Sequence, residues 1–124
     1  MKILVVDDEQ DIQTLFQQRF RREIRAGAFE FVFRFSGEEA LGYLREHPSE
    51  AILILSDINM PGMSGLELLR QIRRQAPAPP PYIMMITAYG DPEKQGEAMQ
   101  LGADDFLNKP LDFNTLKQKL EQLS

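Results

Sequence analysis

The sequence has no cysteine, no tryptophan and a single histidine among its 124 residues. Without cysteine the chain has no thiolate nucleophile, no thiolate zinc site and no disulfide framework. One histidine likewise excludes a metal centre built from several imidazoles. Long apolar runs are also missing, because the longest cover about five residues whereas a helix that spans a bilayer needs about 20. We therefore expect a cytoplasmic protein that does not enter a membrane.

Positive charge is in deficit, since 14 Lys and Arg residues stand against 19 Asp and Glu residues, which gives a net charge of −5 at pH 7. This balance argues against nucleic acid or an anionic membrane surface as a direct partner. A chain of this length is large enough to bury roughly two-thirds of its unfolded surface as one compact domain. No internal repeat divides it, so we expect a single domain over residues 1–124.

Three short, wholly apolar runs predict strands that are covered on both faces of a parallel sheet. They occupy residues 3–6, 51–55 and 82–86. Residues 29–35 instead alternate phenylalanine with charged or aliphatic residues, which is typical of a strand near a sheet edge. A weaker run at residues 106–107 predicts a fifth strand.

Amphipathic stretches separate these strands. Apolar residues at spacings of three and four predict one continuous helix over residues 12–24, with Gly27 as its stop. Helix N-caps are predicted at Ser36, Ser64 and Asp91. The helix over residues 92–101 is mostly polar, and Ala98 and Leu101 are its expected core contacts. Strand and helix thus alternate five times, which predicts an α/β fold of parallel strands with helices on both faces.

Polar residues follow four of the predicted strands, at the sheet edge where ligands bind in open α/β folds. They are Asp7, Asp8, Asp57, Asn59, Thr87 and Lys109. Clustered carboxylates repel one another unless a cation offsets them, and oxygen ligands without histidine or cysteine favour Mg²⁺. Lys109 and Thr87 are each able to meet a phosphoryl oxygen. Because polar residues follow four strands and not one, the alternative that the acidic residues only solvate loops is disfavoured. A carboxylate nucleophile, a divalent cation and a lysine at one site instead predict phosphoryl transfer to aspartate.

With these residues the chain resembles the receiver domains of two-component response regulators. The resemblance spans essentially the whole chain, through the segments Ile3–Glu9, Asp57–Gly65 and Phe106–Leu111. It implies a flavodoxin-like, doubly wound (βα)5 fold whose five-stranded parallel sheet has the order 2-1-3-4-5. It also implies a single receiver domain, without an output domain in these 124 residues.

The resemblance implies a role for each of the four strand ends. Asp57 would accept a phosphoryl group from a sensor histidine kinase or a histidine phosphotransfer protein. Asp8 would bind Mg²⁺ together with Asp57 and the backbone carbonyl of Asn59, and Asp7 would act through metal-bound water. Lys109 would pair with the phosphoryl group.

The resemblance further implies a conformational switch. The Lys109–Pro110 bond would be cis, an isomer that proline makes accessible. Thr87 would move toward the phosphoryl group, and Phe106 would turn inward with it, although an aromatic residue at that position is otherwise simply core. The polar helix over residues 92–101 lies between these two residues in the sequence, as expected of an element that shifts.

The expected function is therefore a phosphorylation-activated switch that catalyses its own phosphorylation and dephosphorylation but acts mainly as a regulator. A hydrolase with an aspartyl-phosphate intermediate is one alternative, but such enzymes usually place two aspartates two residues apart, whereas Asp7 and Asp8 are adjacent. A degenerate receiver that works without phosphorylation is another. Family members often contact output partners, or dimerise on phosphorylation, through the fifth strand and last two helices.

The arginines near the end of the first predicted helix and the single histidine are interpreted as structural residues. The arginines at positions 19, 21, 22 and 25 are interpreted as a solvated helix face, with a kinase-docking surface as the alternative. His47 precedes a proline and is predicted to lie at an exposed helix end, so it is not expected to carry a phosphoryl group.

Overall fold

The computed structural model describes residues 1–48, 50, 53–75, 79–88 and 91–123. Strands and helices alternate along this part of the chain. In order they are β1 (Lys2–Val6), α1 (Asp11–Arg19), α2 (Arg21–Arg25), β2 (Glu30–Arg34), α3 (Gly37–Glu46), β3 (Leu53–Asp57), α4 (Gly65–Gln75), β4 (Tyr82–Ala88), α5 (Pro92–Gln100), β5 (Asp105–Lys109) and α6 (Phe113–Leu123).

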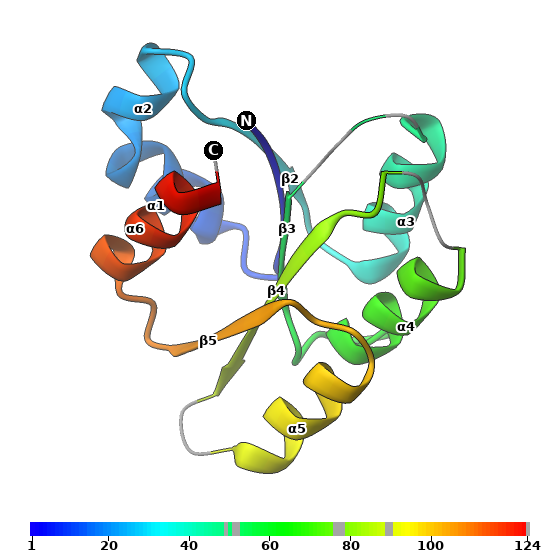
Figure 1. Ribbon diagram of the computed structural model, residues 1–124. Coiled ribbons are helices and arrows are strands. Elements are labelled where there is room, and N and C mark those ends of the chain that lie inside the picture. The colour runs from blue at the N-terminus through cyan, green and yellow to red at the C-terminus, as the bar shows by residue number, and fades with distance from the viewer. Residues whose placement is uncertain (49, 51–52, 76–78, 89–90, 124) are drawn as a thin grey trace.

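The strands form one parallel sheet in the order β2-β1-β3-β4-β5. Helices α1, α2 and α6 cover one face, and α3, α4 and α5 cover the other (Figure 1). This is the predicted doubly wound α/β fold. The strands extend beyond the predicted ranges: β3 continues to Asp57, β4 continues to Ala88 and β5 spans Asp105–Lys109. Residues 51–52, predicted to begin the third strand, lie outside the described part of the chain.

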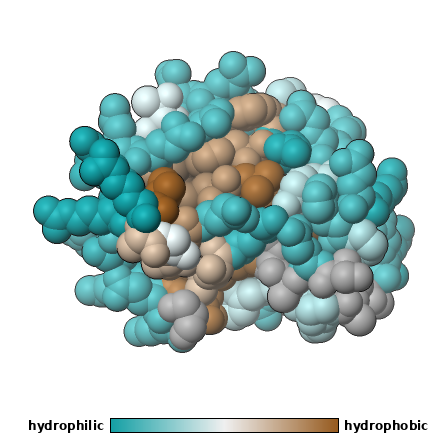
Figure 2. Space-filling model, turned by 90° about the horizontal axis from the view of Figure 1, so that it is seen from above, coloured by the Kyte–Doolittle hydropathy of each residue, from teal (hydrophilic) through white to brown (hydrophobic). Residues whose placement is uncertain are grey.

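Successive side chains of β1 enter two separate cores, because alternate residues of a strand point to opposite faces. Ile3 and Val5 pack with the core beneath α1 and α6, whereas Leu4 and Val6 pack with the core beneath α3 and α4. The central strands are therefore buried on both faces, as their uninterrupted apolar sequences predicted. Figure 2 shows the molecule from above the view of Figure 1, where apolar side chains gather at the centre of the surface and hydrophilic side chains surround them.

The prediction of one continuous helix over residues 12–24 is wrong. Helix α1 ends at Arg19, and α2 begins at Arg21 after a non-helical residue, Phe20. The Phe20 ring is buried and lies 5.7 Å from the Phe16 ring and 5.8 Å from the Phe29 ring. Burial of such a ring contributes roughly 1.5–3 kcal/mol, which stabilises the interrupted path. Ile24 remains exposed and does not continue the apolar stripe.

The predicted helix caps are confirmed. Each cap side chain accepts a hydrogen bond from the backbone N–H three residues further on: Ser36 from Glu39 at 3.0 Å, Ser64 from Glu67 at 3.2 Å and Asp91 from Lys94 at 3.1 Å. Ala98 is fully buried and Leu101 packs against the same core, also as expected. Among the described helices, none is long and apolar enough to cross a membrane.

The prediction that His47 lies at an exposed helix end is wrong. Its ring is half-buried and stacks on Tyr43, with ring centroids 4.1 Å apart. The ring atom Nδ1 also lies 2.9 Å from the carbonyl oxygen of Tyr43. His47 therefore closes the end of α3 by packing along it, and is not an exposed helix end.

Candidate functional site

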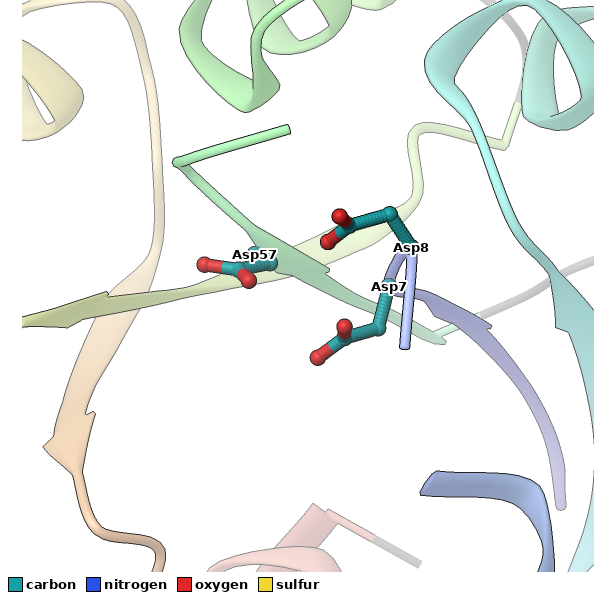
Figure 3. A group of neighbouring side chains, drawn as sticks. All are labelled: Asp7, Asp8 and Asp57. Atoms are coloured by element: carbon teal, nitrogen blue, oxygen red, sulfur yellow. The ribbon is translucent and has the colours of Figure 1, made fainter. Parts of the chain in front are cut away.

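The pairing of β1 with β3 brings two aspartates together at the carboxyl edge of the sheet. Val6 is in register with Ser56, so the residues that follow them, Asp7 and Asp57, lie side by side. Asp8 extends from the loop after β1, and Figure 3 shows its carboxyl group turned to the same side as the other two. Carboxylate oxygens of the three aspartates lie within 4.8 Å of one another.

These aspartates differ in their surroundings. Asp7 and Asp57 are only 3 % and 2 % exposed, whereas Asp8 is exposed. The N–H of Glu9 donates to Oδ1 of Asp7 at 2.9 Å, and the N–H of the exposed Asn59 donates to Oδ1 of Asp57 at 3.3 Å. Each loop thus begins with a hydrogen bond that holds its aspartate in place.

Burial is the main reason why the pKa of Asp7 is raised. The negative charge of Asp57 raises it further, while the hydrogen bond from Glu9 and the charge of Lys109 lower it by less. In the absence of a cation, ionised Asp7 is therefore electrostatically unfavourable at this position.

Lys109 reaches this cluster from the end of β5. Its Nζ donates to Oδ2 of Asp57 at 2.8 Å and lies 4.0 Å from Oδ2 of Asp7. Burial lowers the pKa of Lys109, but the hydrogen bond and charge of Asp57 and the charge of Asp7 outweigh this effect, so the pKa is raised. The Lys109–Pro110 peptide bond is cis, the isomer that the resemblance implied.

The charge of the cluster fits a divalent cation. One ammonium faces three carboxylates, so the ionised groups carry a net charge of two negative units. All three aspartates offer oxygen atoms, which are the ligands that Mg²⁺ takes in proteins. The donor set and its charge are therefore suited to this metal.

Thr87 and Phe106 lie on the neighbouring strands β4 and β5. Thr87 is fully buried, and its Oγ1 has no hydrogen-bond partner among the described residues. A buried hydroxyl without a partner costs about 1–3 kcal/mol, so Thr87 would gain from an added acceptor. Phe106 is half-buried and packs against the core beneath α3, α4 and α5.

Sequence reasoning assigned no role to Gly65, although this residue allows α4 to begin against the backbone of Asp57. A Cβ atom at position 65 would lie 2.0 Å from the carbonyl oxygen of Asp57. The N–H of Gly65 also donates to the carbonyl oxygen of Ile58 at 2.8 Å. Its place in the Asp57–Gly65 motif was the available signal, but the contact itself is visible only in the fold.

A groove of about 570 Å³ opens beside Asp7 and Lys109. Apolar residues of α1 and of the segment after β5 supply most of its wall: Ile12, Leu15, Leu111 and Phe113. The four arginines at positions 19, 21, 22 and 25 line a second depression together with Lys117 of α6. Lys117 forms an ion pair with Glu23 at 3.2 Å.

A doubly wound parallel sheet with three aspartates, a threonine and a lysine at the carboxyl ends of its strands defines a receiver-type α/β domain. Residues 3–121 match the family described as the response regulator receiver domain, and the chain belongs to that family. Receiver domains bind Mg²⁺ at an acidic pocket and act as phosphorylation-activated signalling switches in two-component systems, where response regulators interact with histidine kinases.

Similar proteins include longer regulators. The transcriptional regulatory protein ZraR of Salmonella typhimurium is 37 % identical over 120 residues, which cover 97 % of this chain and 25 % of that protein. The response regulator RppA of Synechocystis sp. is 33 % identical over 123 residues, which cover 99 % of this chain and 50 % of that protein. The chain thus spans a quarter to a half of the length of these relatives.

Solved structures resemble the whole domain. A response regulator receiver domain protein from Clostridium thermocellum has a TM-score of 0.83 at 27 % identity, covering 98 % of this chain and 91 % of that one. The chemotaxis protein CheY4 of Vibrio cholerae has a TM-score of 0.81 at 30 % identity, covering 99 % and 98 % of the two chains.

Proposed function

We propose that this chain accepts a phosphoryl group on Asp57, in a Mg²⁺-dependent reaction, and then changes which partner it binds. The donor would be the phosphohistidine of a sensor kinase or phosphotransfer protein in the cytoplasm. The observation that carries this proposal is the position of Asp57, a buried carboxylate between two further aspartates and the ammonium of Lys109.

The metal would be held by Asp8, by Asp57 and by the backbone carbonyl of Asn59, with Asp7 acting through water. When bound, Mg²⁺ would neutralise charge on the carboxylates and on the phosphoryl oxygens. The net negative charge of the ionised cluster and the burial of Asp7 and Asp57 support this assignment.

In the transfer itself, a carboxylate oxygen of Asp57 forms a bond to phosphorus as the P–N bond of the phosphohistidine breaks. The electron pair of that bond returns to the imidazole of the donor, and the product on this chain is an acyl phosphate. The ammonium of Lys109 donates to Oδ2 of Asp57 at 2.8 Å, and it would pair with a phosphoryl oxygen after the transfer. Catalysis of this kind depends on positioning and charge neutralisation.

The response to phosphorylation would begin at Thr87. Its buried Oγ1 lacks a partner among the described residues, so a hydrogen bond to a phosphoryl oxygen would satisfy it. Phe106 would then turn inward. Helix α5, which connects β4 to β5, has Ala98 as its one buried residue, and so few buried contacts oppose its displacement.

The groove beside the cluster suits the donor protein. It borders Asp7 and Lys109, and the exposed Leu15 contributes to its apolar wall. An amphipathic helix that carries a phosphohistidine would bury its apolar side there and bring the phosphorus atom to Asp57.

Phosphorylation with a small donor provides the test. The wild-type chain, incubated with acetyl phosphate and Mg²⁺, is expected to gain the mass of one phosphoryl group, and EDTA is expected to prevent the gain. The Asp57→Asn variant is the matched control and should stay unmodified. An unmodified wild-type chain, or equal modification of Asp57→Asn, would refute the assignment.

Addition of beryllium fluoride and Mg²⁺ gives an independent readout, because this anion imitates a phosphoryl group on a carboxylate. We expect NMR shifts at Thr87, at Phe106 and along α5. Shifts confined to the loops around Asp57 would contradict the switch.

A further inference from the structure

The strand β2 forms one edge of the sheet, and within the described residues it pairs only with β1. The N–H of Glu30 donates to the carbonyl of Met1 at 2.8 Å, and the carbonyl of Arg34 accepts from the N–H of Asp7 at 3.2 Å. Backbone groups of alternate residues point to opposite sides of a strand. Those of Glu30, Val32 and Arg34 therefore face β1.

The backbone groups of Phe31 and Phe33 accordingly face away from the sheet. Among the described residues, neither N–H group has a hydrogen-bond partner outside the sheet ladder. The carbonyl of Phe33 accepts a hydrogen bond from Nη1 of Arg34 at 2.8 Å. On this edge of the described chain both N–H groups are thus free, and the carbonyl of Phe33 is covered only by a side chain.

The sequence of the strand is symmetric about its centre. Glu30-Phe31-Val32-Phe33-Arg34 reads the same in both directions, except that its two ends carry opposite charges. In an antiparallel pair centred on Val32, Phe31 of each copy would face Phe33 of the other. Both phenylalanines present outward backbone groups, so each of these pairs would exchange two hydrogen bonds.

We propose that two copies of this chain associate through β2, antiparallel and about a twofold axis at Val32, so that their sheets become continuous. The occupant of the edge is a second copy because the charges are self-complementary. Glu30 of each copy would lie opposite Arg34 of the other, an arrangement that favours pairing. Sliding one strand by two residues would remove both charge pairs, so the charges also select the register.

Apolar surface next to the edge supports the same arrangement. A groove of about 370 Å³ lies between β2 and the α1–α2 segment, with Ile24, Phe29 and Phe31 in its wall. Ile24 is 36 % exposed, and Phe31 is half-buried. A second copy would extend this row of phenylalanines and cover part of the groove.

The contacts of the two charged residues predict that the association is weak and depends on concentration. In the single chain Glu30 pairs with Lys2 at 3.2 Å, and the Arg34 guanidinium lies 4.9 Å from the centre of the Tyr43 ring. Arg34 would exchange its bond to Phe33 for a bond to Glu30 of the second copy. Charged residues commonly protect edge strands from pairing, but here their symmetric placement makes them complementary between copies.

Charge reversal tests the partner and the register together. In sedimentation measurements from micromolar to millimolar concentration, without phosphodonor, the apparent mass of the wild type should rise from 14.2 kDa toward twice that value. Glu30→Arg alone and Arg34→Glu alone should each raise the dissociation constant by about tenfold, because like charges then face each other. An equimolar mixture of the two variants, and the double variant, should recover the association.

A wild type that stays monomeric throughout would overturn the proposal, and so would variants that dimerise as well as the wild type. Because no phosphodonor is present, either result leaves the phosphorylation of Asp57 untouched. Failure of the mixture to recover association, with both variants folded by circular dichroism, would also overturn it.

A single introduced cysteine tests the axis, since the chain has no native cysteine. Across a central pair without hydrogen bonds the Cα atoms lie about 4.5 Å apart, within reach of a disulfide. Val32→Cys should therefore form a covalent dimer under mild oxidation. Glu30→Cys is the matched control, because its two copies would lie about 14 Å apart along the strands. Equal cross-linking of both variants would overturn the proposed axis.

Discussion

The ammonium of Lys109 lies 2.8 Å from Oδ2 of Asp57, although β4 separates β5 from β3 in the sheet. The contact is possible because all these strands are parallel and end at the same edge, where the lysine side chain extends across the end of β4. It links the proposed phosphoacceptor directly to the strand that carries Phe106. This link makes the lysine a candidate for coupling chemistry to conformation.

Replacement of Lys109 should separate these two events. In Lys109→Ala, intact mass after treatment with acetyl phosphate and Mg²⁺ should still reveal modification of Asp57, whereas the NMR shifts at Phe106 and α5 should be lost. Lys117→Ala is a suitable control because this lysine pairs with Glu23 on the helical surface. Equal switching in Lys109→Ala and the wild type would contradict the coupling role.

Neutralising Asp7 should stabilise the metal-free protein. Burial raises the pKa of Asp7 above its usual 3.8, so the folded state binds this proton more tightly than the unfolded state. The contribution of Asp7 to stability therefore falls as pH rises from 3.8 through the raised value, and ionised Asp7 is destabilising above it. Asp7→Asn keeps an acceptor for the N–H of Glu9 and removes this cost.

We expect Asp7→Asn to increase the free energy of unfolding at pH 7, because it removes a buried negative charge that raises the pKa of this carboxyl. Urea unfolding in EDTA measures the effect, which should vanish below pH 3.8, where the wild-type carboxyl is protonated as well. Asp8→Asn should give a smaller gain because Asp8 is exposed. Loss of stability in Asp7→Asn at pH 7 would show that burial does not dominate the energetics of this carboxylate.

Gly65 should tolerate no side chain. Its Cβ would lie 2.0 Å from the carbonyl oxygen of Asp57 and 2.8 Å from Cα of Ile58, both backbone atoms that cannot rotate away. Gly65→Ala should therefore lower the free energy of unfolding by about 3 kcal/mol, at the upper end of overpacking costs, and displace the loop after Asp57. Denaturant unfolding measures the loss.

Gly96→Ala is the matched control for this substitution. Apart from neighbouring residues of the chain and the backbone of its own helix, no atom of the described residues lies within 4 Å of the position of its Cβ, and the residue is inside α5. Because alanine favours a helix interior over glycine by about 1 kcal/mol, this variant should be more stable than the wild type. Similar losses in the two variants would contradict a specific close approach at Gly65.

Local patterns predicted much of this fold. Apolar runs located the central strands, and Ser36, Ser64 and Asp91 marked three helix starts, because strand burial and capping depend on neighbouring residues in the chain. The convergence of Asp7 and Asp57 followed from topology, since parallel strands deliver their carboxyl ends to one edge.

Features that depend on contacts between residues far apart in the sequence could not be predicted from local patterns. The break of the first helix rests on the packing of Phe20 against Phe29 from the next strand. Arg73 of α4 donates to the carbonyl oxygens of Gly102 and Pro81 and to the carboxylate of Asp104. All three acceptors lie outside α4, in parts of the chain that only the fold brings close to Arg73. Nothing near Arg73 in the sequence distinguishes it from its neighbour Arg74.

Thr87 provides a substitution with opposite effects on stability and on switching. Its Oγ1 is buried and without a partner among the described residues, so Thr87→Val, which keeps the shape and removes the hydroxyl, should raise the free energy of unfolding by about 1 kcal/mol. The same variant should still bind beryllium fluoride at Asp57 but lose the NMR shifts at Phe106. Thr87→Ser keeps the hydroxyl and should retain those shifts despite a loss of packing. If Thr87→Val is both less stable than the wild type and fully able to switch, the hydroxyl is neither an unsatisfied group nor a ligand of the phosphoryl oxygen.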